Sequence, residues 1–117
     1  MAETIDGLLG ADHARRIALE RMTQRAGVAA SFLKALSHEG RLMILCHLLS
    51  GEKSVTELER LLDSRQAAVS QKLARLRLEG LVSSRRDGKA IYYSIQDPNV
   101  SRTIALVYEM FCSSDPA

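Results

Sequence analysis

The apolar positions in the first part of the chain recur with the period of a helix. Residues 11–26 carry a narrow apolar stripe, which predicts an amphipathic helix that ends at Gly27. A second, more apolar helix is expected over residues 28–37 (VAASFLKALS), and a third over residues 38–51 (HEGRLMILCHLLSG). Gly51 closes the third segment, in the position where glycine commonly follows a helix. The chain is therefore expected to begin with three helices.

Two shorter helices are expected next, joined by a tight turn. The segment TELERLL opens with Thr56 and has Glu59 three residues later, which is the pattern of a capping box at a helix start. Ser64 is expected to cap the following helix, which runs to about Glu79 and stops before Gly80. This pair is typical of a helix-turn-helix.

The second helix of this pair has two distinct sides. Val69, Leu73 and Leu76 lie within about 60° of one another at 100° per residue, so they are predicted to face the core. The opposite side comprises Ala67, Ser70, Gln71, Ala74 and Arg75. Small and polar side chains suit a surface that approaches base edges, because glutamine bonds adenine, serine bonds several bases, and alanine methyls touch thymine methyls.

From Leu81 the period of the pattern changes to two. The segment LVSSRRDGKAIYYSI carries Asp87-Gly88 between two strand-like runs, which is a strong hairpin signal. A two-residue turn at this dipeptide predicts three cross-strand pairs: Arg86 with Lys89, Ser84 with Ile91, and Val82 with Tyr93. The same alternation predicts an inward face of Val82, Ile91, Tyr93 and Ile95 behind a basic tip.

A final helix is expected to start at Asp97-Pro98. Its apolar residues repeat at helical spacing and form a stripe of Val100, Ile104, Val107 and Phe111. Two short helices, a tight turn and a hairpin with a basic tip describe a winged helix-turn-helix, mainly α-helical with a small β-hairpin wing. The 117 residues fit a single domain, with residues 1–10 and 113–117 expected to be flexible.

Charge is unevenly distributed along the chain. Residues 64–89 hold seven basic and two acidic residues, a net charge of +5, whereas the rest of the chain has a net charge of −3. A basic segment in a slightly acidic protein indicates a polyanionic partner, although a solvated charged face gives the same count. Gln66 lies at the end of the helix that usually meets the DNA groove. The residues predicted to contact phosphates or the minor groove are Arg65, Lys72, Arg75, Arg85, Arg86 and Lys89.

Composition argues against several classes of protein. No apolar run approaches the ~20 residues of a membrane span, and the N-terminus lacks the basic and apolar stretches of a signal peptide. We therefore expect a cytoplasmic protein with reduced thiols. An enzyme and a cofactor are not expected, because the sequence has no CxxC motif, no activating His or Arg at helical spacing from a cysteine, and no catalytic loop.

Residues 32–95, which include ALSHEGRLMIL, AAVSQKLARLRLEGLV and RRDGKAIYYSI, resemble the ArsR/SmtB family of bacterial winged-helix repressors. The resemblance implies a homodimer built on the N- and C-terminal helices, which binds a partly palindromic operator and releases it when an inducer binds. The apolar stripes of both terminal helices agree with a dimer. Their periodicity fits equally well with helices that merely cover the core of their own domain.

The metal sites of this family's familiar sensors are not matched. Arsenic- and cadmium-type sensors carry Cys-Val-Cys where this chain has Ser54 and Thr56. Of the four zinc ligands that zinc-type sensors place on the last helix, one is matched, by Asp97. The other three places hold Asn99, Met110 and Ser113, and the histidines (His13, His38 and His47) show no paired spacing. No metal is expected.

The two cysteines admit two interpretations. By themselves, Cys46 is read as a buried hydrophobic residue and Cys112 as an incidental thiol. The family resemblance implies another role, because their positions match the persulfide- and sulfide-responsive (BigR/SqrR-like) branch, in which two thiols become joined by reactive sulfur species and DNA is released. The alternatives are a general peroxide or disulfide-stress repressor of the same fold, a thiol enzyme, and a winged-helix module that binds protein.

Overall fold

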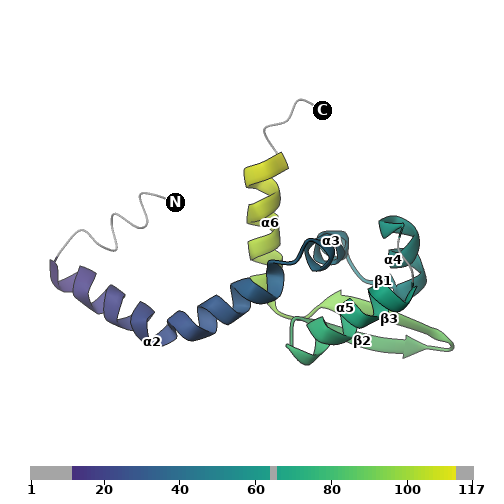
Figure 1. The fold of residues 1–117 in the computed structure, drawn as a ribbon, viewed down its shortest axis with the longest axis horizontal. Helices are drawn as coiled ribbons and strands as arrows, with labels where there is room; N and C mark the ends of the chain where they lie inside the picture. The colour runs from purple at the N-terminus through teal and green to yellow at the C-terminus, as the bar shows by residue number, and fades with distance from the viewer. Residues whose placement is uncertain (1–11, 64–65, 113–117) are drawn as a thin grey trace. The chain divides into compact units, whose positions relative to one another are not determined.

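The computed structural model describes residues 12–63 and 66–112, which form helices and a small sheet (Figure 1). The elements are α2 (Asp12–Leu36), α3 (Glu39–Leu48), β1 (Lys53–Ser54), α4 (Val55–Leu62), α5 (Gln66–Leu78), β2 (Val82–Asp87), β3 (Ala90–Ile95) and α6 (Pro98–Cys112). The chain divides into two units, residues 1–34 and 35–117.

The described part of the first unit is one helix where two were expected. Helix α2 continues through Gly27, so the predicted break there is wrong. A single glycine in a helix interior costs about 1 kcal/mol relative to alanine, and the helix-forming residues on both sides outweigh that cost. Apolar side chains remain exposed along this unit: Ile17, Leu19, Met22, Val28 and Leu33.

The core of the second unit is built mainly by α3, α5, α6 and the β2–β3 hairpin. The core-facing side predicted for α5 is confirmed, since Val69, Leu73 and Leu76 are all buried. Their buried neighbours are Ile44, Leu45 and Leu48 of α3, Leu58 of α4, Val82 and Tyr93 of the hairpin, and Val100 and Ile104 of α6. The α4–α5 pair and the hairpin make this unit a winged helix-turn-helix, as the sequence predicts.

Helix α4 starts two residues earlier than expected. Its capping box is formed by Ser54 and Glu57, each side chain bonding the other's backbone N–H at 3.1 Å. The predicted box of Thr56 and Glu59 is therefore wrong, although both pairs fit the same sequence pattern. Ser54 is the residue that also pairs with Tyr92 in the sheet, so the chain leaves the strand and enters the helix at this position. The predicted cap of α5, Ser64, lies outside the described residues.

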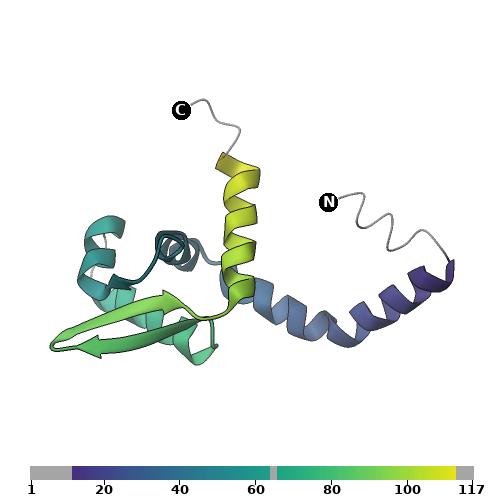
Figure 2. The same ribbon diagram turned by 180° about the vertical axis from the view of Figure 1, so that it is seen from behind.

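The wing is a three-stranded antiparallel sheet in the order β1-β3-β2, with the hairpin in front in Figure 2. The third strand, β1, was not expected, because two residues are too few to show an alternation. The predicted register is also wrong by two residues, since Arg86 pairs with Ile91 and Asp87 with Ala90. Gly88 is then the first turn residue and has a φ of 64°, as a type II′ turn requires.

The predicted inward face of the hairpin survives this error in register. A slip of one residue moves every side chain to the other face of a sheet, whereas a slip of two keeps each on its own face. Val82 and Tyr93 are buried, and Ile91 and Ile95 are half-buried. The pattern therefore predicts the face of each strand correctly without predicting its partner.

The last helix begins where the sequence predicts. Asp97 accepts bonds from the backbone N–H groups of Asn99 and Val100, each at 2.9 Å, just before α6. Its apolar stripe runs from buried residues (Val100 and Ile104) to Phe111, which is 73% exposed. Across the described residues, none of the helices is both long and apolar enough to cross a membrane.

Candidate DNA interface and cysteine pair

The side of α5 that faces away from the core carries the residues that the sequence singles out for base contacts. Gln71, Ala74 and Arg75 are exposed and Ser70 is half-buried. Gln66 and Ala67 begin this helix, and their side chains, like Arg65, lie outside the described residues. Lys72 is half-buried, because its side chain lies across the start of α3. One accessible surface of α5 therefore presents an amide, a hydroxyl and cationic groups together.

The basic residues of the wing have different environments. The Arg85 guanidinium donates two hydrogen bonds to the Glu52 carboxylate, at 2.8 and 2.6 Å, and lies 4.6 Å from the centroid of the Tyr92 ring. The bonds from Arg85 hold the pKa of the Glu52 carboxyl below its usual value. Arg86 and Lys89 are exposed, and within the described residues neither belongs to an ion pair. The wing thus has one engaged arginine and two available cations near its tip.

The two cysteines are on helices that pack against each other. Cys46 is half-buried on α3, and Cys112 is exposed as the last residue of α6. Burial raises the pKa of the Cys46 thiol, and the negative charge of a Cys112 thiolate raises it further. Cys46 is therefore a partly accessible thiol, on a helix that packs against the helix carrying a second, more accessible one.

Several residues of this region were not predicted from the sequence. Glu52 lies 33 positions from Arg85, and no local pattern indicates their pairing. Gly40, His38 and Arg41 lie beside α5 although they belong to the start of α3. In the described parts of the chain, no three His, Cys, Asp or Glu residues gather as a metal ion would require.

The chain is similar to known regulators over most of its length. The family model described as bacterial regulatory protein, arsR family, matches residues 38–84. The Biofilm growth-associated repressor of Agrobacterium fabrum is 43% identical over 99 residues, which cover 85% of each chain. The Transcriptional activator HlyU of Vibrio cholerae is 38% identical, over 83% of this chain and 90% of its own.

Solved structures of such regulators have the same fold. The transcriptional repressor BigR from Xylella fastidiosa superimposes with a TM-score of 0.76 at 41% identity, over 80% of this chain and 95% of its own. Reduced HlyU from Vibrio cholerae N16961 gives 0.75 at 39% identity, over 80% of this chain and 98% of its own. Identity at this level over this length, with a matching winged helix, means that the chain belongs to the arsR family of bacterial regulatory proteins.

Proposed function

We propose that the protein is a homodimeric transcriptional repressor that releases its operator when reactive sulfur species bridge Cys46 and Cys112. The observation that carries this proposal is the placement of the two thiols on packed helices, with Cys46 half-buried on α3 and Cys112 exposed at the end of α6. Support for a redox-dependent state comes from the relative HlyU, whose solved form is described as reduced.

Operator binding rests on α5 and the wing. The exposed face of α5 offers Gln71 and Ser70 to base edges, with Gln66 and Ala67 at the end of the helix that enters the groove in such proteins. Lys72, Arg75, Arg86 and Lys89 supply positive charge for the phosphates. Arg85 joins them only by exchanging its carboxylate partner, Glu52, for a phosphate.

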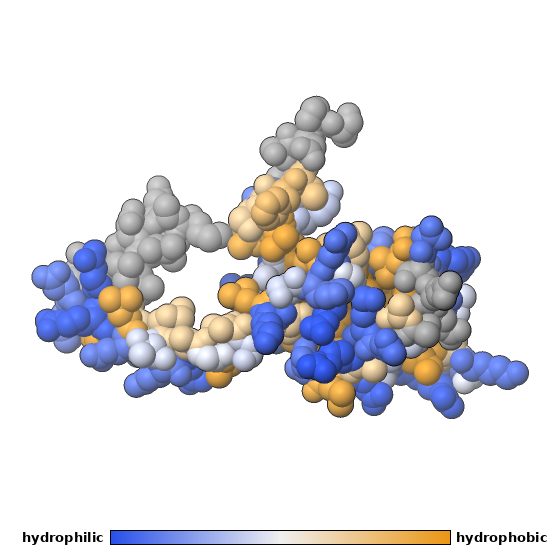
Figure 3. Space-filling model, in the orientation of Figure 1, coloured by the Kyte–Doolittle hydropathy of each residue, from blue (hydrophilic) through white to orange (hydrophobic). Residues whose placement is uncertain are grey.

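Assembly into a dimer rests on the exposed apolar residues of α6. Tyr108, Met110 and Phe111 are 57%, 56% and 73% exposed, and apolar residues cover much of the visible face of α6 (Figure 3). Large apolar side chains on one helix are costly in water and are typical of an interface. A dimer also matches the two-fold symmetry of a partly palindromic operator.

The chemistry begins at the more accessible thiol. The Cys112 thiolate attacks the outer sulfur of a low-molecular-weight persulfide, RSSH, and the thiolate RS⁻ leaves. Cys112 is then itself a persulfide. The Cys46 thiolate attacks its Sγ atom, a disulfide forms, and hydrosulfide leaves with the former outer sulfur. Two thiols are oxidised and one sulfur atom is reduced to sulfide, so the electrons balance. Burial raises the pKa of the Cys46 thiol and lowers its thiolate fraction, so the first attack is assigned to the more exposed Cys112.

A peroxide or disulfide-stress repressor is the second candidate, because the same two thiols would resolve a sulfenic acid equally well. A thiol enzyme has less support, since the relatives are transcriptional regulators. A module that binds protein leaves the polar face of α5 and the available cations of the wing without a role.

Mass spectrometry of the intact protein distinguishes these candidates. The reduced protein is treated in turn with a persulfide, hydrogen peroxide and oxidised glutathione, and the Cys46–Cys112 cross-link is identified in peptide digests. We expect persulfide to give an intramolecular bridge at the lowest dose. A bridge with additional sulfur atoms will appear as a heavier cross-linked peptide. Bridging by peroxide at an equal or lower dose favours the stress-sensor alternative, and the absence of any bridge refutes the proposal.

A further inference from the structure

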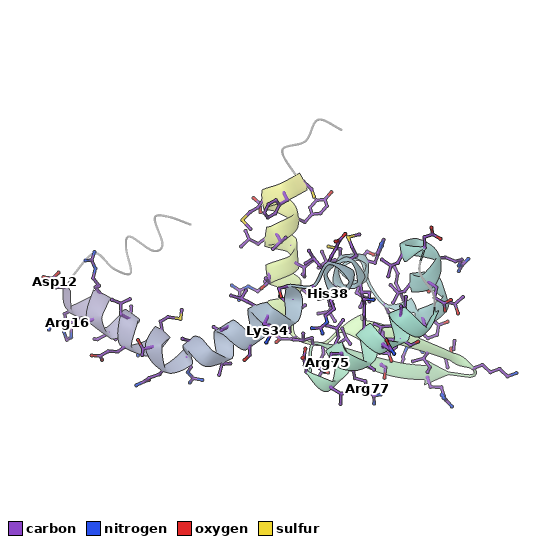
Figure 4. All side chains as sticks on the ribbon, viewed as in Figure 1. Asp12, Arg16, Lys34, His38, Arg75 and Arg77 are labelled. Carbon is purple, nitrogen blue, oxygen red and sulfur yellow. The ribbon has the colours of Figure 1, made fainter. Side chains whose placement is uncertain are left out.

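A basic hollow lies between the start of α3 and the outer side of α5. It has a volume of about 330 Å³ and is lined by His38, Arg41, Gln71, Lys72 and Arg75. Four of these five side chains are basic and none is acidic. Hydrophilic residues gather in this region of the surface in Figure 3. Figure 4 shows the side chains there of His38, which caps the start of α3, and of Arg75 on α5. The sequence assigns three of the five to DNA binding, but not His38 or Arg41.

The two residues from the start of α3 are held in place by the backbone. One guanidinium nitrogen of Arg41 donates to the carbonyl oxygen of Ala35 at 3.3 Å, and the other N–H groups of this five-donor side chain are left for a further partner. Nδ1 of His38 accepts a bond from the N–H of Gly40 at 3.2 Å. The ring proton of the neutral imidazole is therefore on Nε2, which is available as a donor.

Gly40 leaves room for the Lys72 side chain at the start of α3. A Cβ atom at this position would collide with Cε of Lys72 and would lie 3.1 Å from its Cδ. The absence of a side chain lets Lys72 extend across the start of α3, so that its ammonium group joins Arg41 at the hollow. Arg75 is paired with Glu79 through Nε at 3.2 Å, but this exposed pair is weak and leaves the other guanidinium nitrogens available.

We propose that this hollow binds a backbone phosphate of DNA, so that His38 and Arg41 extend the DNA interface from α5 onto α3. The inference rests on the proposed function, because it takes operator DNA as the ligand. Guanidinium and ammonium donors from two helices match the oxygens of a phosphate. Gln71 lines the hollow and also belongs to the base-facing side of α5, so the bound phosphate belongs to the strand next to the bases that this helix reads.

Salt dependence of DNA binding tests the assignment. Each phosphate neutralised by the protein adds about 0.9 to the slope of log K against log salt concentration. Using a duplex of mixed sequence, we expect Arg41→Gln to reduce the slope by about 1 and to lower the affinity at every salt concentration. The matched control is Arg102→Gln, which removes the same charge from α6, away from the hollow, and should leave the slope unchanged. An unchanged slope in folded Arg41→Gln overturns the inference.

Two further measurements cover the case in which Arg41→Gln melts well below the wild type. His38→Asn keeps a side chain that accepts the bond from Gly40, since asparagine is a favoured helix cap, but loses the Nε2 donor. We expect it to melt like the wild type and to bind the duplex more weakly. In the wild type, the duplex should shift the NMR signal of His38 Nε2. Wild-type affinity in His38→Asn, or an unmoved Nε2 signal, overturns the inference.

Inorganic phosphate separates DNA from a free anion as the ligand. Titrated at constant ionic strength, it should shift the His38 signal only weakly. Saturable binding of inorganic phosphate, combined with wild-type DNA affinity in His38→Asn, would assign the hollow to a free phosphate and overturn the DNA assignment. If the wild type shows no salt-dependent binding to any duplex, the proposed function itself fails. The further inference alone fails if the wild type binds the duplex with the expected salt dependence and the variants bind it equally well.

Discussion

Arg85 has a different environment from the two basic residues beyond it on the wing. Its guanidinium is held by two bonds to Glu52 and by the ring of Tyr92, whereas Arg86 and Lys89 are exposed. The Glu52 contact ties β2 to the segment between α3 and β1. At the scale of single residues, Arg85 is therefore engaged by Glu52 and Tyr92, while Arg86 and Lys89 near the tip stay available.

The Glu52–Arg85 pair predicts a specific pH dependence. Because the pKa of Glu52 is lowered in the folded state, the stabilisation from this pair is fully present above the ordinary glutamate value of about 4.3. It is lost only as the pH falls through the lowered folded value. In an NMR titration, Arg85→Gln should raise the midpoint of Glu52 towards the ordinary value.

Glu57 is the internal control for that titration. Its pKa is lowered by the backbone N–H of Ser54, and not by Arg85, so its midpoint should be the same in both proteins. If the midpoint of Glu52 is also the same in both, Arg85 does not hold this carboxylate in solution.

At the scale of elements, the helices and their buried faces were more predictable than their boundaries. The buried face of α5 follows from apolar spacing alone. The spacing of Val69, Leu73 and Leu76 puts them on one side of the helix, and an apolar side of a helix packs against the core. The start of α4 cannot be predicted in this way, because Ser54 and Thr56 both fit the sequence pattern of a capping box. Its position depends on the bond partner of Ser54 in the sheet, Tyr92, which is distant in sequence.

The wing shows the same limit. Alternation predicts which face each residue takes, but the register depends on which residue adopts the positive φ of the turn. The location of Cys46 and Cys112 on two packed helices could be expected only from family resemblance, because it depends on how α3 packs against α6. The basic hollow also arises between two helices, so neither segment alone indicates it.

Helix α6 carries the prediction about assembly. Phe111→Asp places a charge on an exposed apolar surface, so within a monomer it should cost little. In a dimer built on this surface it buries an unpaired charge, and we expect monomers in sedimentation experiments and a collapse of operator affinity. Asn99→Asp adds the same charge at the other end of α6 and should remain dimeric. A stable dimer of Phe111→Asp would show that the interface lies elsewhere.

At the scale of the whole molecule, the proposed switch requires only modest energy. A bridge between α3 and α6 joins the scaffold of the DNA-binding unit to the helix that carries the proposed dimer surface. If the bridged dimer holds its two α5 helices out of alignment with the half-sites, a coupling of about 1–3 kcal/mol lowers operator affinity by about 5–150-fold. No change within the winged helix itself is needed.

The most direct test of the proposed switch is to measure the operator affinity of the wild type, Cys46→Ser and Cys112→Ser, each with and without persulfide. The operator is first selected from a pool of random duplexes with the reduced protein. A bridge needs two thiols, so we predict that all three reduced proteins bind equally well and that persulfide weakens the wild type alone, by about 5–150-fold. A Cys112→Ser protein that still releases DNA on treatment, or a bridged wild type that binds as tightly as the reduced one, would contradict the account.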